Sequence, residues 1–227
     1  MSGEGDLSAY LRPTWFIDSD SPEVREFSRN AVGSAATPEE KAKLLFYAVR
    51  DGINYDPYRI EFTPEAFRAS TILKKGFGYC VAKAIVLTAA SRAVGVPSRL
   101  RFADVRNHLT TERLRRLMKT DLFIFHGYSE FYLHNRWVKA TPTFNLSLCE
   151  RFKVKPLDFD GVNDAVFHPF DAEGRRHMEY VNDHGSFADV PYERIVEMFR
   201  LHYGAYFEVK KETEAGAFER EAVLERP

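Results

Sequence analysis

The chain has little cysteine, and the two cysteines suit neither a disulfide framework nor a zinc site. Cys80 and Cys149 are the only two cysteines in 227 residues, too few for a disulfide framework. Neither has a second cysteine or a pair of histidines beside it at zinc-ligand spacing. We therefore expect a reduced protein without a metal site and without a cofactor.

Long apolar runs and an excess of one charge are also missing. No run approaches the roughly 18 apolar residues of a membrane span, and residues 1–15 have neither the basic start nor the apolar stretch of a secretory signal. Lys and Arg total 32 against 33 Asp and Glu, so no net field would attract nucleic acid or an anionic membrane. We expect a cytoplasmic protein that binds neither.

Apolar and aromatic residues are plentiful. Hydrophobic residues make up 44% of the chain, with 19 Phe and 11 Tyr, which excludes general disorder. A chain of this length fits one domain and can bury roughly 70% of the surface that it exposes when unfolded. Half of residues 210–227 are charged, and this segment is predicted to be a frayed helix or a tail.

Several helices are marked by their capping residues. Ser21 followed by Pro22 predicts a helix over 22–32. Thr37 and Glu40 have the spacing of a capping box and predict a helix to about Asp51. Further helices are expected from Thr63, over 111–119 and over 191–203. The pattern of these segments requires only amphipathic packing, so we interpret them as scaffold.

Cys80 stands at the start of another helix. An alanine-rich run over 81–94 follows it and ends at Gly95, and Gly76 and Gly78 precede it. The positive end of a helix lowers a thiol pKa, the glycines would let a carbonyl approach, and nearby amides could bind an oxyanion. The alternative is that Cys80 only fills a buried helix start.

His126 is predicted to lie on a strand. Residues 122–133 alternate, with phenylalanines on one face and His126 on the polar face, and a turn at 134–136 leads into a return strand over 137–141. A cysteine nucleophile needs a base from elsewhere in the fold. Among seven histidines, position favours His126, with His108 second. A purely structural His126 is the alternative.

Taken together, these segments resemble the transglutaminase-like superfamily. The likeness covers about residues 40–145 and rests on four segments: Gly78-Tyr79-Cys80, Ser91 to Arg99, the strand with His126, and Trp137 to Thr143. It implies an α+β, papain-like fold in which N-terminal helices and the Cys helix pack on an antiparallel sheet. It also implies a single domain over 1–209, with its core at about 37–145 and a C-terminal extension over 146–209. Cys80 and His126 match the first two catalytic positions.

The third catalytic position departs from the family pattern. The family's aspartate falls here on Thr141, which can hydrogen-bond but carries no negative charge to stabilise an imidazolium. Asn145 is a rival orienting residue, because a hairpin turning near residue 135 places it across from His126. Alternatively, Thr141 and Asn145 make only turn hydrogen bonds.

Other side chains are candidates for contacting substrate, because the strand after the Cys helix runs beside the His strand in the implied fold. Each is alternatively structural. These candidates are Tyr79, Arg99, Asp104, Asn107, His108 and Glu130. The basic side chains of 111–119 are interpreted as a solvated helix face, and Cys149 as buried filler.

The function that we predict is cysteine-dependent hydrolysis or acyl transfer. Cys80 attacks an amide or related carbonyl of a small molecule or peptide, His126 moves the proton, and a thioester acyl-enzyme forms. One alternative is a non-catalytic binding module that lost its acid at Thr141. Others are a retro-Claisen-type C–C bond hydrolase and an arylamine acetyltransferase-like acyl-CoA enzyme.

Overall fold

The protein has a mixed α+β fold built on a four-stranded antiparallel sheet. The structure is a computed structural model, and it describes residues 6–108, 110–167, 174, 177–204 and 217–224. The sheet has the order β5-β4-β3-β6, with strands β3 (Ser98–Asn107), β4 (Leu122–Leu133), β5 (Arg136–Ala140) and β6 (Met178–Phe187). Two short parallel strands, β1 (Asn54–Tyr55) and β2 (Phe77–Gly78), form a second sheet.

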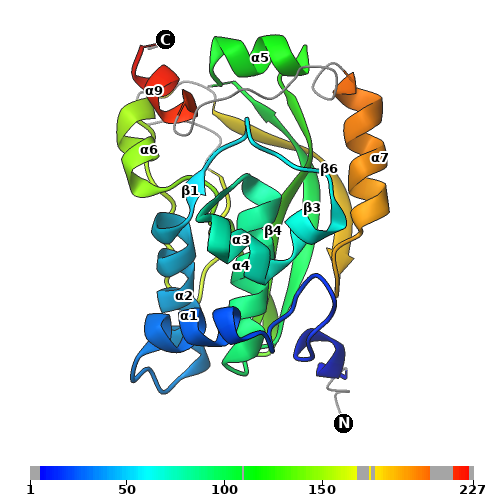
Figure 1. Ribbon diagram of the computed structural model, residues 1–227. Coiled ribbons are helices and arrows are strands. Elements are labelled where there is room, and N and C mark those ends of the chain that lie inside the picture. Colours follow the sequence, from blue (N-terminus) through cyan, green and yellow to red (C-terminus); the bar gives the residue numbers. More distant parts are fainter. Residues whose placement is uncertain (1–5, 109, 168–173, 175–176, 205–216, 225–227) are drawn as a thin grey trace.

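Helices and turns surround these strands (Figure 1). The α-helices are α1 (Pro22–Val32), α2 (Pro38–Gly52), α3 (Ala69–Lys75), α4 (Cys80–Ala93), α5 (Glu112–Met118), α6 (Leu146–Phe152), α7 (Tyr192–His202) and α9 (Ala217–Leu224), and the 3₁₀ turns are Ser8–Tyr10 and Pro64–Phe67. In the described part of the chain, no helix combines the length and apolarity needed to cross a membrane.

The capping signals predicted the helix starts correctly. The Ser21 side chain accepts a hydrogen bond from the Val24 backbone N–H. Thr37 and Glu40 form the reciprocal capping box, in which each side chain bonds to the other residue's backbone. These bonds satisfy amides that the first helical turn leaves unpaired.

Helix α4 is the central element of the fold. It packs against α1, α2 and α3 on one side and against β4 on the other, and all its residues from Cys80 to Arg92 are buried. Its buried cations are paired with backbone oxygens: Lys83 Nζ donates to the carbonyls of Arg50 and Ile53, while Arg92 donates to those of Ser98, Arg12 and Ala188. The predicted packing of the Cys helix on an antiparallel sheet is confirmed.

Strands β4 and β5 form the predicted hairpin. His134 and Asn135, at the turn, both have positive φ angles, as in the type I′ turn that suits the twist of paired strands. The face of β4 that carries His126 is buried, although the sequence pattern indicated a polar face. Rings and ion-paired side chains from neighbouring strands cover it.

Beyond residue 145 the structure contains elements that the sequence pattern did not reveal. Helix α6 and strand β6 lie in the predicted extension. Strand β6 pairs with β3 from Leu100 to Asn107. The predicted tail contains α9, which packs on α6 and buries Phe218. The boundaries of the single domain and of the tail remain predictions.

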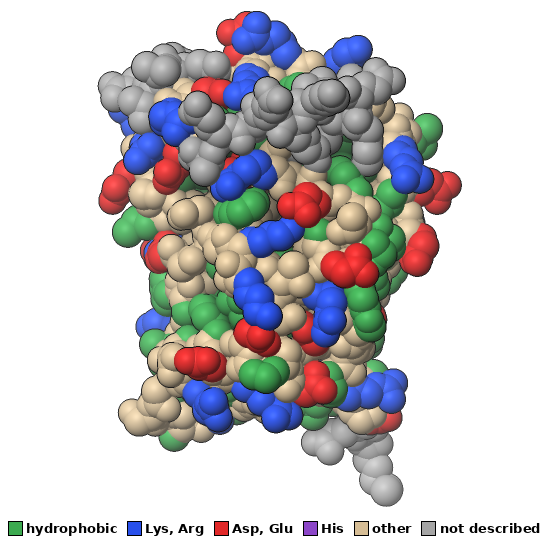
Figure 2. Space-filling model, in the orientation of Figure 1, with side chains coloured by type: hydrophobic (Ala, Val, Ile, Leu, Met, Phe, Trp, Pro, Cys, Tyr) green, Lys and Arg blue, Asp and Glu red, His purple; other side chains and the backbone are tan. Residues whose placement is uncertain are grey.

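Charges of both signs are mixed over the face in Figure 2, where Lys and Arg side chains lie next to Asp and Glu side chains. This agrees with the balanced totals of the sequence. No single-signed field marks this face.

Candidate active site

Cys80 is the first residue of α4, as predicted. Tyr79 is the N-cap residue and makes no side-chain capping bond, so the thiol lies close to unpaired helix amides. The N–H groups of Val81 and of Gly127 on β4 both act to lower the thiol pKa. Burial outweighs them and raises the pKa of Cys80 to about 11. The expected helix-lowered pKa is therefore wrong here, because desolvation disfavours the thiolate more strongly than the amides favour it.

Two glycines bring neighbouring segments against α4. A Cβ at Gly127 would lie 3.0 Å from the Cα of Val81 and 3.2 Å from the Phe102 ring, and a Cβ at Gly78 would lie 2.6 Å from that of Ala82. The sequence suggested that Gly78 leaves room for a substrate. Its role in the structure is close packing of β2 on the first turn of α4.

His126 lies on β4 directly after an irregularity in the strand. Its side chain is buried, and its Nε2 atom has no hydrogen-bond partner in the described part of the chain. The ring of Phe167 is 5.0 Å away, and those of Tyr128 and Tyr180 are near. Burial lowers the pKa of His126 to about 3, because it is costly to desolvate the imidazolium. Both the thiol and the imidazole are thus neutral near pH 7.

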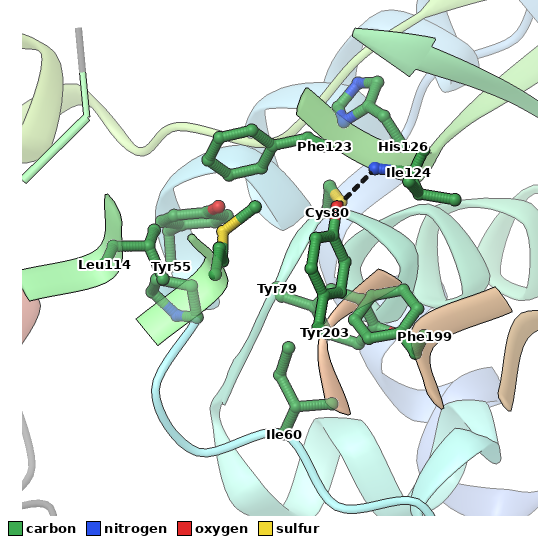
Figure 3. A pocket seen from close by; sticks show the side chains of 12 residues that line it. Tyr55, Ile60, Tyr79, Cys80, Leu114, Phe123, Ile124, His126, Phe199 and Tyr203 are labelled. Carbon is green, nitrogen blue, oxygen red and sulfur yellow. Dashed lines mark hydrogen bonds between the residues drawn. The ribbon is translucent and has the colours of Figure 1, made fainter. Parts of the chain in front are cut away.

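Cys80 and His126 line one pocket (Figure 3). The empty space at the pocket, its opening to solvent included, is about 430 Å³. Besides Cys80, His126 and Tyr79, the described residues that line it are Tyr55, Pro57, Ile60, Leu114, Met118, Phe123, Ile124, Phe199 and Tyr203. The thiol and the imidazole share this pocket without a hydrogen bond between them, since the Nε2 atom is unpartnered and the thiol meets backbone amides.

A β-bulge sets the position of His126. Phe125, the extra residue, has a φ of 55°, a conformation that non-glycine residues rarely adopt. Its N–H donates to Oδ1 of Asp104 over 3.0 Å, and the same carboxylate is held by His184 and Asn182 of β6. Asp104, predicted to contact substrate, lies outside the lining of the pocket and fixes the backbone just before His126.

The two candidates for the third position have different surroundings. Thr141 is buried close to Tyr180. Burial raises the pKa of the Tyr180 phenol to about 12, and the Thr141 side chain partly offsets this rise. Tyr180 in turn contacts the His126 ring. Asn145 is instead engaged elsewhere: its Oδ1 accepts from the Tyr55 N–H and its Nδ2 donates to Ser147. Its amide is therefore committed to the start of α6.

The other predicted contact residues, apart from Tyr79, lie outside the described lining of the pocket. Glu130 is buried between Arg99 and Arg101, at 2.6 Å and 3.1 Å, and Arg99 also stacks on Trp137. Asn107 is buried near His177 in another cavity. His108 lies 3.8 Å from Glu179. Arg99 and Glu130 thus pair with each other, His108 lies beside Glu179, and Asn107 faces a different cavity.

The sequence pattern missed most of the pocket. Leu114 and Met118 belong to the helix that was interpreted as a solvated basic face, and they are its buried side. Phe199 and Tyr203 come from the last predicted helix and its end, more than a hundred residues from Cys80. An apolar stripe along each helix was the available signal, but it does not tell which cavity the stripe lines.

No cluster of three or more His, Cys, Asp or Glu side chains able to hold a metal ion occurs among residues that the structure describes.

Comparison with known proteins identifies the family. The family model of the transglutaminase-like superfamily matches residues 25–142, more than half of the chain. The chain therefore belongs to the transglutaminase-like superfamily, and the resemblance of the Cys80, His126 and Trp137 segments is confirmed. No curated protein matches the chain.

Several solved structures match this chain, and each shares little sequence with it. A candidate cysteine protease from Cytophaga hutchinsonii is 17% identical, with 83% of this chain and 58% of that chain covered and a TM-score of 0.49. A candidate protease from Parabacteroides distasonis has 14% identity, 62% and 26% coverage and a TM-score of 0.38. Red sea bream transglutaminase has 15% identity, 100% and 47% coverage and a TM-score of 0.46. This chain thus spans less than two thirds of each of these proteins.

Proposed function

We propose that the protein is a cysteine-dependent hydrolase or acyltransferase that acts on a carbonyl of a small molecule or peptide. The observation that carries the proposal is the shared pocket: the first residue of the central helix and the histidine of the adjacent strand both line it. A nucleophile and a base delivered by separate elements to one cavity are what covalent acyl transfer needs.

The proposed reaction has two steps. The Cys80 sulfur bonds to the substrate carbonyl carbon while His126 takes the thiol proton, and the leaving amine or alcohol departs with that proton, which gives a thioester. Water or a second amine then attacks the thioester, gives its proton to His126, and releases the acyl group as the thiol is restored.

The neutral pair requires that proton transfer and attack occur together. With pKa values of about 11 for Cys80 and about 3 for His126, forming the ion pair in the empty pocket would cost on the order of 10 kcal/mol before the ions attract each other. The attacking sulfur becomes more acidic as it bonds to carbon, so His126 serves as general base during attack. The N–H groups of Val81 and Gly127, already close to the sulfur, are the proposed oxyanion donors.

Acyl-enzyme trapping tests this proposal. We would incubate the protein with p-nitrophenyl esters and p-nitroanilides, measure nitrophenol or nitroaniline release, and locate the acyl group by mass spectrometry of the intact protein and its peptides. An acyl group on Cys80, absent in Cys80→Ala and retained in Cys149→Ala, supports the proposal. Release that is unchanged in Cys80→Ala refutes it.

A non-catalytic binding module is the second candidate. It is favoured by the unpartnered Nε2 atom of His126 and by Thr141 in the position of the family's acid. In that case the same pocket binds its ligand without turnover. Saturable binding of a compound would favour this candidate if no acyl adduct forms and no ester is hydrolysed above its spontaneous rate.

A further inference from the structure

The pocket beside Cys80 is lined almost entirely by apolar and aromatic side chains. Apart from Cys80 and His126, its described lining contains no ionisable group other than three tyrosines. Figure 3 shows rings and aliphatic chains facing the thiol from several directions. The lining is drawn from the segment after β1, from α5, from β4 and from the end of α7.

The polar atom of Tyr203 is already occupied. Its hydroxyl accepts a hydrogen bond from the Ile124 N–H and donates one to the Leu122 carbonyl. The dashed line in Figure 3 marks the first of these bonds. Tyr203 therefore offers the pocket its ring, and its hydroxyl is not available to select a polar substrate group.

Nearby cations are directed elsewhere. Arg113, next to Leu114 on α5, pairs with Glu221 and stacks on Tyr58. Arg115 and Arg116 are on the exposed side of the same helix. Helix α5 thus turns its apolar side chains toward the pocket, and its charges point away from it.

Such a lining discriminates strongly against charge. A carboxylate or ammonium moved into it would lose its hydration and would meet no oppositely charged side chain of the described lining, whereas an apolar group would leave water favourably. Resting on the proposed function, we infer that the acyl group transferred by Cys80 is uncharged and apolar, either aromatic or branched aliphatic.

A matched series of esters tests this substrate class. We would compare kcat/KM for p-nitrophenyl phenylacetate, isovalerate, acetate and hemisuccinate, after subtracting the rate of Cys80→Ala. The expected order places phenylacetate and isovalerate first, with phenylacetate at least about 100-fold above hemisuccinate. Equal values for phenylacetate and hemisuccinate overturn the inference.

Binding without chemistry separates this inference from the proposed function. In Cys80→Ala, phenylacetamide should bind at least about tenfold more tightly than succinamate by calorimetry. If phenylacetamide binds so while no ester acylates the wild type, the pocket assignment stands and the proposed function fails. If esters acylate Cys80 without preference, the function stands and the inference fails.

A charge placed at the pocket gives a second test. Phe123 is only partly buried, so Phe123→Lys should fold, and it should lower the phenylacetate to hemisuccinate ratio by at least about tenfold. Phe27→Lys on α1, also partly buried and outside the pocket lining, is the matched control and should leave the ratio unchanged. An unchanged ratio in folded Phe123→Lys contradicts the assignment. If that variant fails to fold, the wild-type series still decides.

Discussion

The protein contains two buried cysteines, each of which lines a pocket together with a histidine, and the two differ in their surroundings. Cys149 lies within the seven-residue helix α6, and its thiol points to the Phe144 carbonyl 3.9 Å away. It shares a small cavity with His177. Cys80 begins the 14-residue helix α4 and meets backbone N–H groups instead. Burial raises the pKa of both thiols to about 11.

Neither burial nor pKa therefore separates the two cysteines. The difference lies in the atoms that surround each sulfur: a carbonyl oxygen can only accept the thiol proton's hydrogen bond, whereas amides can stabilise negative charge on sulfur or on a substrate oxygen. The larger apolar pocket also lies at Cys80. The N–H donors around the sulfur therefore distinguish the candidate nucleophile better than the pKa of the thiol before substrate binds.

Removing each sulfur gives the largest expected effect. With the best ester of the series, Cys80→Ala should lose at least about a thousandfold in kcat/KM, because no nucleophile remains. Cys149→Ala should stay within about twofold. Both values are measured with purified protein whose melting temperature is within a few degrees of wild type. Equal losses in the two variants would remove the distinction between the cysteines.

Changing the two histidines gives the next largest effect. His126→Asn should reduce kcat/KM by roughly 100- to 10,000-fold, since a general base in this role contributes that much. His177→Asn should change it by no more than about threefold. The pH profile of the residual activity is the additional readout, because loss of a base removes its titration while simple misfolding does not. Activity that survives in His126→Asn with its pH profile intact would contradict a base at this position.

Alkylation at different pH values tests the neutral state of the site. Because both thiol pKa values are raised to about 11, the thiolate fraction at either cysteine rises about tenfold per pH unit below that value. Iodoacetamide should therefore label both slowly at pH 7 and about 100-fold faster at pH 9, as followed by peptide mass spectrometry. Fast labelling of Cys80 alone at pH 6 to 7 would instead reveal a thiolate–imidazolium pair.

The close approach of β4 to α4 gives an effect on stability. Gly127→Ala should lower the free energy of unfolding by about 2 kcal/mol, because its Cβ would press on the Val81 backbone and the Phe102 ring. Gly52→Ala is the control, with no atom within 4 Å of the added Cβ, and it should be neutral or stabilising by up to about 1 kcal/mol. Urea denaturation measures both. Equal stability of the two variants would mean that β4 can move away from the helix that carries Cys80.

Local signals account for what the sequence predicted well. The capping box at Thr37, the helix beginning at Cys80 and the turn at His134 each depend on residues a few positions apart. Strand β6 was missed because its central residues include Asn182, Asp183 and Gly185, which disfavour strands, and pairing with β3 forms it nonetheless.

The candidate site was predictable in Cys80, in His126 and in one contact residue, Tyr79. Cys80 and His126 stood out through helix start, strand and family resemblance. Their pKa directions could not be foreseen, because burial by α5, α7 and Phe167 decides them. Which of the predicted contact residues line the pocket also depends on long-range structure. Tyr79 lines it, whereas Arg99 and Glu130 pair with each other across the sheet.

The smallest effect concerns Thr141, which borders the Cys149 cavity and also lies near the Tyr180 ring that contacts His126. Thr141→Asp would restore the family's acid, and its charge should raise the His126 pKa and so speed alkylation of Cys80 at pH 7 by about three- to tenfold. The gain is small because a buried carboxylate is itself costly to ionise. Thr141→Asn, of equal size and without charge, should give no gain. Identical rates in the two variants would mean that residue 141 belongs only to the Cys149 cavity. The site around Cys80 would then work without a third residue at this position.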